Sequence, residues 1–208
     1  MKSFELNPAD EISSNQNDTS TYNPDQRLEY PTEELSLSTF NYDLDLPLFP
    51  IHLDECLQPF KEENWTQLDE DEKWDAVLDL KEAIENDLYL TNDLGLAYYE
   101  GDNPMYYGSY LPQDCMIVIN RNLLDRPEQL VKTLSHELRH AWQEALIRLP
   151  ENEHDEFIRL LDFNNENYIR PEDNYLAYRN QPMEIDAREY ACLLYTSPLS
   201  DNLLGSDQ

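Results

Sequence analysis

Cysteine, glycine and long hydrophobic runs are scarce in this chain, and each shortage excludes a class of protein. The 3 Cys form no C-x-x-C pair and suggest no disulfide framework. The 4 Gly form no G-x-G-x-x-G or G-K-[ST] loop, so no nucleotide cofactor is expected. No run approaches the roughly 18 apolar residues of a membrane span, and the first residues, MKSFELNPADE, do not resemble a secretory signal. These absences predict a protein of a reducing cytoplasm.

Basic residues are also few. The 208 residues include 44 Asp and Glu but 14 Lys and Arg, which gives a formal net charge of -30. Such a field repels nucleic acid and anionic lipid, and it favours basic partners or metal cations. We therefore expect no direct nucleic-acid binding and no membrane binding. Solubility or adaptation to high salt would account for the same charge.

Three regions differ in composition. Residues 1–45 are rich in Asn, Asp, Ser, Thr, Pro and Glu, and their apolar residues follow no period. This composition predicts a disordered or loosely docked acidic arm. We expect one folded domain over residues 46–200 and a flexible tail over residues 201–208.

Within the domain, hydrophobic periodicity predicts helices and one clear strand. The strand is CMIVIN, which is short, apolar and β-branched, and a Tyr- and Gly-rich segment before it suggests loop and a short strand. The expected helices cover residues 68–90, a stretch that starts at Pro127, residues 153–163 and a last stretch that starts at Pro182. The pattern predicts an α+β fold of about four helices with a small, mostly antiparallel sheet.

The stretch TLSHELRHAWQ contains two of the four histidines, His136 and His140. Residues four apart stack one turn above the other on a helix, so both imidazoles can reach one metal ion. Catalytic zinc sites use three protein ligands and a water. Glu137 is turned by about 100° from His136, so it would not bind the metal but could take a proton from that water. The alternative is a polar helix face opposite the stripe formed by Leu134 and Leu138.

The third ligand has three candidates. His154 lies in an acidic stretch, whereas Glu184 and Asp186 begin the last expected helix. Glu184 shares the face of Ala187, whose small side chain permits close helix packing, and Asp186 points about 160° away from Glu184. We expect Glu184 to be the ligand and Asp186 to lie beside the site or at the surface, although a carboxylate would serve in either place.

Tyr178 precedes that helix. Its hydroxyl could stabilise the oxyanion of a tetrahedral intermediate. With 14 Tyr in the chain, core or surface packing is the more common role for such a residue.

The ordered combination of TLSHELRHAWQ and YRNQPMEIDAREYA resembles the small zincin metallopeptidases with a glutamate third ligand, in particular the ImmA/IrrE-like group and related phage and bacterial proteins. The second stretch matches their pattern E-x-[DE]-A-x-x-[FY]-A at Glu184, Asp186, Ala187, Tyr190 and Ala191. Arg139 stands where that group commonly has glycine. The resemblance implies a minimal zincin-like domain, with CMIVIN as the edge strand over the substrate cleft.

Two functions of different classes follow. The first is a zinc-dependent peptidase in which His136, His140 and Glu184 hold one Zn²⁺ and Glu137 activates the zinc-bound water. Its substrate would be a protein or peptide, and a basic protein would suit the charge. The second is a non-enzymatic acidic binding protein, a DNA mimic or an inhibitor of a basic partner, with a structural or vestigial metal site. A third reading keeps the zincin fold with another hydrolysed substrate.

Overall fold

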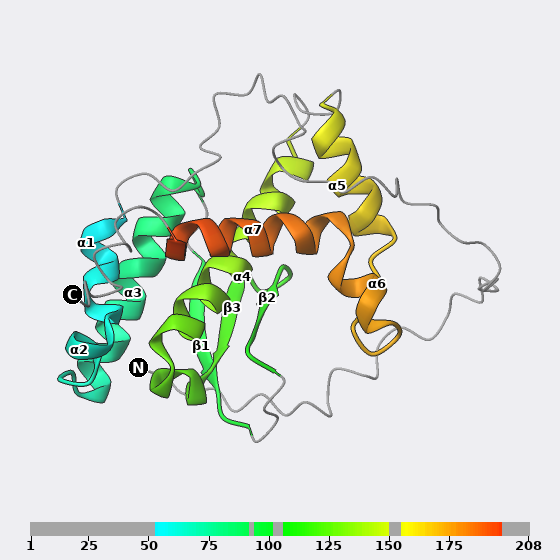
Figure 1. Cartoon of the computed structure of the whole chain (residues 1–208). Coiled ribbons are helices and arrows are strands. Elements are labelled where there is room, and N and C mark those ends of the chain that lie inside the picture. Colours follow the sequence, from blue (N-terminus) through cyan, green and yellow to red (C-terminus); the bar gives the residue numbers. More distant parts are fainter. Residues whose placement is uncertain (1–52, 92–93, 102–105, 150–154, 197–208) are drawn as a thin grey trace, which may run out of the picture.

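The structure is a computed structural model, and it describes residues 53–91, 94–101, 106–149 and 155–196 (Figure 1). The expected arm over residues 1–45, the tail over residues 201–208 and His154 all lie outside these ranges. Among the helices within these ranges, none has the length and apolar character that crossing a membrane requires.

Short helices at the start of the described chain pack beside a long one. They are α1 (Asp54–Leu57), the 3-10 helix η2 (Gln58–Phe60) and α2 (Glu62–Trp65), and α3 (Glu70–Asp87) follows. The α3 helix begins with a capping box, because the Asp69 side chain accepts from the Glu72 backbone and the Glu72 side chain accepts from the Asp69 backbone. Three acidic residues in its first turn complement the helix dipole.

The sheet has three strands, β1 (Gly95–Tyr99), β2 (Gly108–Leu111) and β3 (Met116–Asn120), in the order β1-β3-β2. The α+β class is confirmed, but the sheet is mixed rather than mostly antiparallel, because β1 pairs with β3 in parallel while β2 pairs with it antiparallel. The strand predicted from CMIVIN is β3, and it lies in the centre. The expectation that it forms the edge is therefore wrong, and β2 occupies the edge nearest α4.

In the described part of the chain, four helices exceed ten residues, in agreement with the expected number: α3, α4 (Pro127–Ile147), α5 (Glu156–Glu166) and α7 (Pro182–Thr196). The 3-10 helix η3 (Arg121–Asp125) leads into α4, and the short helix α6 (Tyr175–Arg179) precedes α7. In Figure 1, α7 (orange to red) runs across α4, and these two helices share the largest contact between elements.

The hydrophobic core lies between α4 and its neighbours. Leu130, Leu134 and Leu138 of α4 are fully buried, as are Ala187 and Tyr190 of α7. The small side chain of Ala187 allows the close approach of α7 that the sequence suggested. This packing places the polar residues at the start of α7 against the middle of α4.

Candidate metal centre

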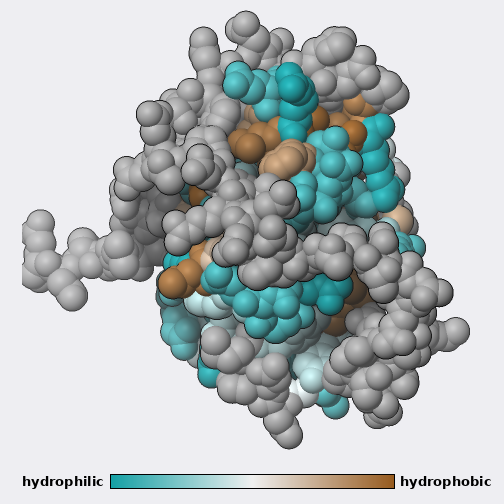
Figure 2. Space-filling view, turned by 90° about the vertical axis from the view of Figure 1, so that its right-hand side faces the viewer, coloured by the Kyte–Doolittle hydropathy of each residue, from teal (hydrophilic) through white to brown (hydrophobic). Residues whose placement is uncertain are grey.

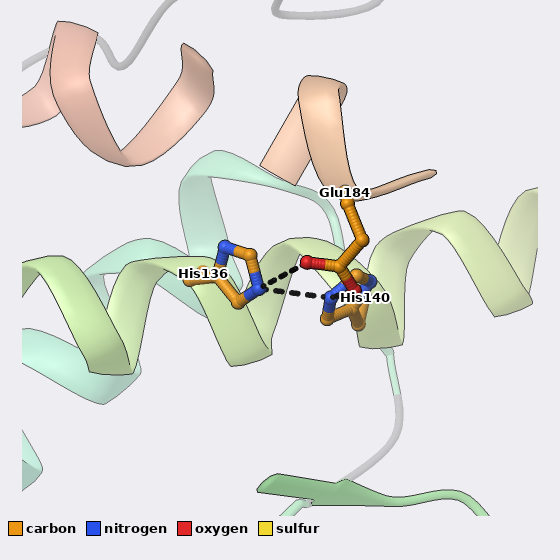
Figure 3. A group of neighbouring side chains, drawn as sticks. All are labelled: His136, His140 and Glu184. Carbon is orange, nitrogen blue, oxygen red and sulfur yellow. Dashed lines mark hydrogen bonds and ion pairs between the residues drawn. The ribbon is translucent and has the colours of Figure 1, made fainter. Parts of the chain in front are cut away.

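Two helices bring the candidate ligands together. His136 and His140 lie one turn apart on α4, and Glu184 reaches them from the first turn of α7 (Figure 3). The Nε2 atoms of the two imidazoles are 3.0 Å apart. Glu184 Oε2 lies 3.3 Å from His136 Nε2, and Glu184 Oε1 lies 3.2 Å from His140 Nε2. These three residues thus form one compact group of two nitrogen donors and one carboxylate.

These separations can be compared with the demands of a metal ion. Zinc binds nitrogen and oxygen ligands at about 2.0–2.1 Å in a tetrahedral arrangement, so two of its ligands should lie roughly 3.3–3.4 Å apart. The observed separations of 3.0, 3.2 and 3.3 Å are close to that value. The donor set of two imidazoles and one carboxylate is also one that catalytic zinc uses. The residues therefore fit a zinc ion without rearrangement of the helices.

The electrostatics of the group show why it would accept a cation. Burial alone would raise the pKa of Glu184, but hydrogen bonds from His136 and His140 and the charges of both imidazoles hold it well below its usual range. Burial alone would lower the pKa of His140, yet the hydrogen bond to Glu184 and the charge of that carboxylate raise it to about 9. In the metal-free protein, an imidazolium therefore faces a carboxylate, and a divalent cation would replace the proton.

Glu137, the expected general base, lies near this group and is not one of its three donors. Its carboxylate is 8% exposed, and Oε2 accepts a hydrogen bond of 2.9 Å from the backbone N–H of Tyr110 on β2. Its charge contributes to the raised pKa values of His140 and of two nearby tyrosines. The residue is thus close to the three donors without being one of them.

Asp186 is placed away from the donors. Its carboxylate accepts from Arg139 Nε at 2.9 Å and from Arg139 Nη2 at 3.0 Å, and both side chains are buried. Gln143 Nε2 donates a third hydrogen bond to it at 2.6 Å. Asp186 therefore bonds to Arg139 and Gln143 rather than to the histidines. Glu184 is the carboxylate that faces them.

Two tyrosines flank Glu184 on its other side. Tyr178, named from the sequence, has a pKa raised by burial and then by the charge of Glu184 and a hydrogen bond to it. Tyr168, which sequence reasoning missed, donates from its hydroxyl to Glu184 Oε1 at 2.5 Å. The ring centroids of Tyr168 and Tyr178 are 6.2 Å apart. Tyr168 lies between α5 and α6, where no periodic pattern could single it out among 14 Tyr.

The side of the molecule that carries α5 and α6 in Figure 1 faces the viewer in Figure 2, where hydrophobic patches interrupt the hydrophilic surface. Several large apolar side chains of this region are exposed, namely Phe163, Tyr168, Tyr175 and Leu176. The neighbourhood of the candidate centre is thus less uniformly polar than the net charge suggests.

Comparisons with known proteins add no assignment. No protein-family model, no curated protein and no solved structure matches the chain. The likeness to small zincin metallopeptidases therefore stays a prediction that depends on the chain's own residues.

Proposed function

We propose that the protein is a zinc-dependent peptidase. The observation that carries the proposal is the convergence of His136, His140 and Glu184, at separations that suit one zinc ion, with Glu137 beside them. A zinc ion bound there would supply a Lewis acid and lower the pKa of a coordinated water to near neutrality.

The position of Glu137 supports the role of a general base. The backbone N–H of Tyr110 donates to Oε2, which orients the Glu137 carboxylate near His140. A structural metal site needs no such group, because four protein ligands would complete it. The role proposed for Glu137 is to accept a proton at its carboxylate and return it to the leaving amine. The hydroxyls of Tyr168 and Tyr178 are candidates for donating to the developing oxyanion.

The edge strand β2 offers a way to hold an extended substrate. The Asn120 N–H donates to the Tyr107 carbonyl, so the backbone of Tyr107 faces β3. Alternation along the strand turns the backbone groups of Gly108 and Tyr110 to the opposite side, toward α4. A peptide could add there as a further strand, next to Glu137. This arrangement supports a protein or peptide substrate, and the net charge of -30 favours basic segments within it.

Metal content tests the site first. Elemental analysis of the purified protein should find about one zinc per chain. Glu184→Gln should lose the zinc, whereas Glu189→Gln, a carboxylate change on the same helix, should retain it. If the wild type holds no zinc after zinc is supplied, or if Glu184→Gln holds as much as the wild type, the proposal fails.

Hydrolysis tests the catalytic role. The zinc-loaded protein is incubated with a pool of synthetic peptides, and new termini are detected by mass spectrometry. Glu137→Gln should reduce cleavage by about 100-fold or more, the usual contribution of a general base, while it retains zinc. Cleavage by Glu137→Gln at the wild-type rate would remove Glu137 from the mechanism.

A specific observation also favours the acidic binding protein as a second candidate. The solvent face of α3 carries a row of exposed carboxylates, namely Glu70, Asp71, Glu72, Asp75, Asp79 and Glu82. A basic partner captured on this face should be lost from Asp71→Lys/Asp75→Lys/Asp79→Lys and should survive removal of zinc by a chelator. A peptidase substrate held at the metal centre would show the reverse dependence.

A further inference from the structure

The amide of Gln143 is fully buried between α4 and α7, and its surroundings determine its orientation. Its Nε2 lies 3.0 Å from the Met183 carbonyl oxygen and 2.6 Å from Asp186 Oδ2. A backbone carbonyl can only accept a hydrogen bond, so the amide nitrogen must face Met183. The amide oxygen Oε1 must then face His140 Nδ1, at 2.8 Å.

This orientation determines the tautomer of His140. The Gln143 oxygen can only accept, so Nδ1 of His140 must carry the proton. In a neutral imidazole the other nitrogen then keeps its lone pair. That nitrogen is Nε2, the atom that faces His136 and Glu184. The Met183 carbonyl thus determines the orientation of the Gln143 amide, and this orientation leaves Nε2 of a neutral His140, the nitrogen that would bind a metal, without a proton.

A buried ion pair holds Gln143 in place. Asp186 accepts its hydrogen bond while it also pairs with Arg139 through two hydrogen bonds. The Arg139 guanidinium lies 3.6 Å from the centre of the Trp142 ring and is fully buried. Since Arg139 lies on α4 and Asp186 on α7, the pair joins the two ligand-bearing helices without a metal.

We propose that Gln143, anchored by Asp186 and Arg139, is the positioning residue of the metal centre, which holds His140 in the tautomer that presents Nε2 to zinc. The inference rests on the proposed zinc site and adds the group that prepares it. Gln143 is not one of the three donors, and its side chain bonds to His140, Met183 and Asp186, so it acts through His140.

Zinc affinity, measured by competition with a chromophoric chelator, tests the role. Gln143→Leu should weaken zinc binding by about 10- to 100-fold, the usual effect of removing such a partner. The matched control is Asn164→Leu, because Asn164 is also a fully buried amide. Its side chain donates to Gln181 Oε1 and accepts from the Met183 N–H, and neither of these bonds involves His140. This variant should destabilise the metal-free protein yet change zinc affinity by less than about threefold. Equal losses in both variants, or none in Gln143→Leu, would overturn the proposal.

Gln143→Glu separates positioning from packing. A carboxylate there can still accept from His140 Nδ1, so zinc affinity should stay within about tenfold of the wild type even though Asp186 is now opposed by an acid. If Gln143→Glu loses as much affinity as Gln143→Leu while both remain folded, acceptance from Nδ1 is not the relevant contact.

A measurement on the wild type avoids dependence on any variant. A long-range ¹H–¹⁵N spectrum of the zinc-loaded protein should show His140 with Nδ1 protonated and Nε2 bound to metal. Coordination through Nδ1 would refute the inference while leaving the zinc site intact. A wild type that binds no zinc would instead refute the proposed function, so the two failures are distinguishable.

Discussion

Replacement of Asp186 by asparagine should be among the most destabilising single changes in the described part of the chain. The substitution keeps the shape of the side chain but removes the counter-charge of Arg139. The two side chains are 0% and 2% exposed, and three hydrogen bonds converge on the Asp186 carboxylate. An unpaired buried guanidinium typically costs about 3–5 kcal/mol. That is a large share of the roughly 5–15 kcal/mol that stabilises a domain.

The assay is urea unfolding of the metal-free protein, so that loss of zinc does not contribute. The matched control is Arg148→Met. It breaks an ion pair with Glu144 at the C-terminal end of α4, but it removes a side chain that is 68% exposed. That change should cost at most about 1 kcal/mol. The double variant Arg139→Met/Asp186→Leu replaces the buried pair with apolar side chains, and it should be more stable than Asp186→Asn alone.

The reasoning would be refuted if Asp186→Asn lowered the free energy of unfolding no more than Arg148→Met does. It would also be refuted if the double variant were as unstable as Asp186→Asn, because the penalty would then not come from the unpaired charge of Arg139.

Three further outcomes are expected. The pKa of His140 is raised to about 9 in the folded protein, against 6.5 in the unfolded chain. Its pairing with Glu184 therefore stabilises the metal-free protein fully below about pH 6.5 and progressively less as the pH rises through about 9. The difference in thermal midpoint between the wild type and Glu184→Gln should shrink between these two pH values. Gly108→Ala should destabilise by about 1–3 kcal/mol, because its Cβ would lie 2.7 Å from Thr133 Cγ2, and unfolding in urea should show partial recovery in Gly108→Ala/Thr133→Ser. Cys115 has a φ of 48°, so Cys115→Gly should keep or raise the thermal midpoint, while Cys115→Val should lower it by a change worth roughly 1–2 kcal/mol.

Local sequence patterns were sufficient to predict a helix or a strand where one of them dominated the segment. The apolar repeat of α4, with Pro127 at its start, predicted the helix that carries His136 and His140. The short, apolar and β-branched run of β3 predicted a strand, although not its central place in the sheet. The strands β1 and β2 were harder to recognise, because each is only half-buried along its whole length and is rich in Gly and Tyr. The small sheet therefore had fewer expected strands than the structure contains.

Helix geometry predicted that Glu184 and Asp186 point in different directions and favoured Glu184 as the ligand, but it could not establish which one faces the histidines. That depends on how α7 rotates against α4, which the burial of Ala187 and the pairing of Asp186 with Arg139 decide together. Arg139 occupies an unspecified position of the H-E-x-x-H motif, so the motif predicts no role for it. The structure shows its role through its contact with Asp186, which lies 47 positions further along the sequence.

The sequence by itself thus determined the candidate donors, their helical spacing and the α+β class, because these depend on residue type and on periodicities of a few residues. The tertiary structure decided the strand order, which makes β3 central and places β2 beside Glu137. It also decided that Glu184 faces the histidines while Asp186 accepts a hydrogen bond from Gln143, and that Gln143 contacts His140. Strand order and side-chain pairing are set by contacts between segments far apart in the chain, and no local pattern records which of those contacts will form.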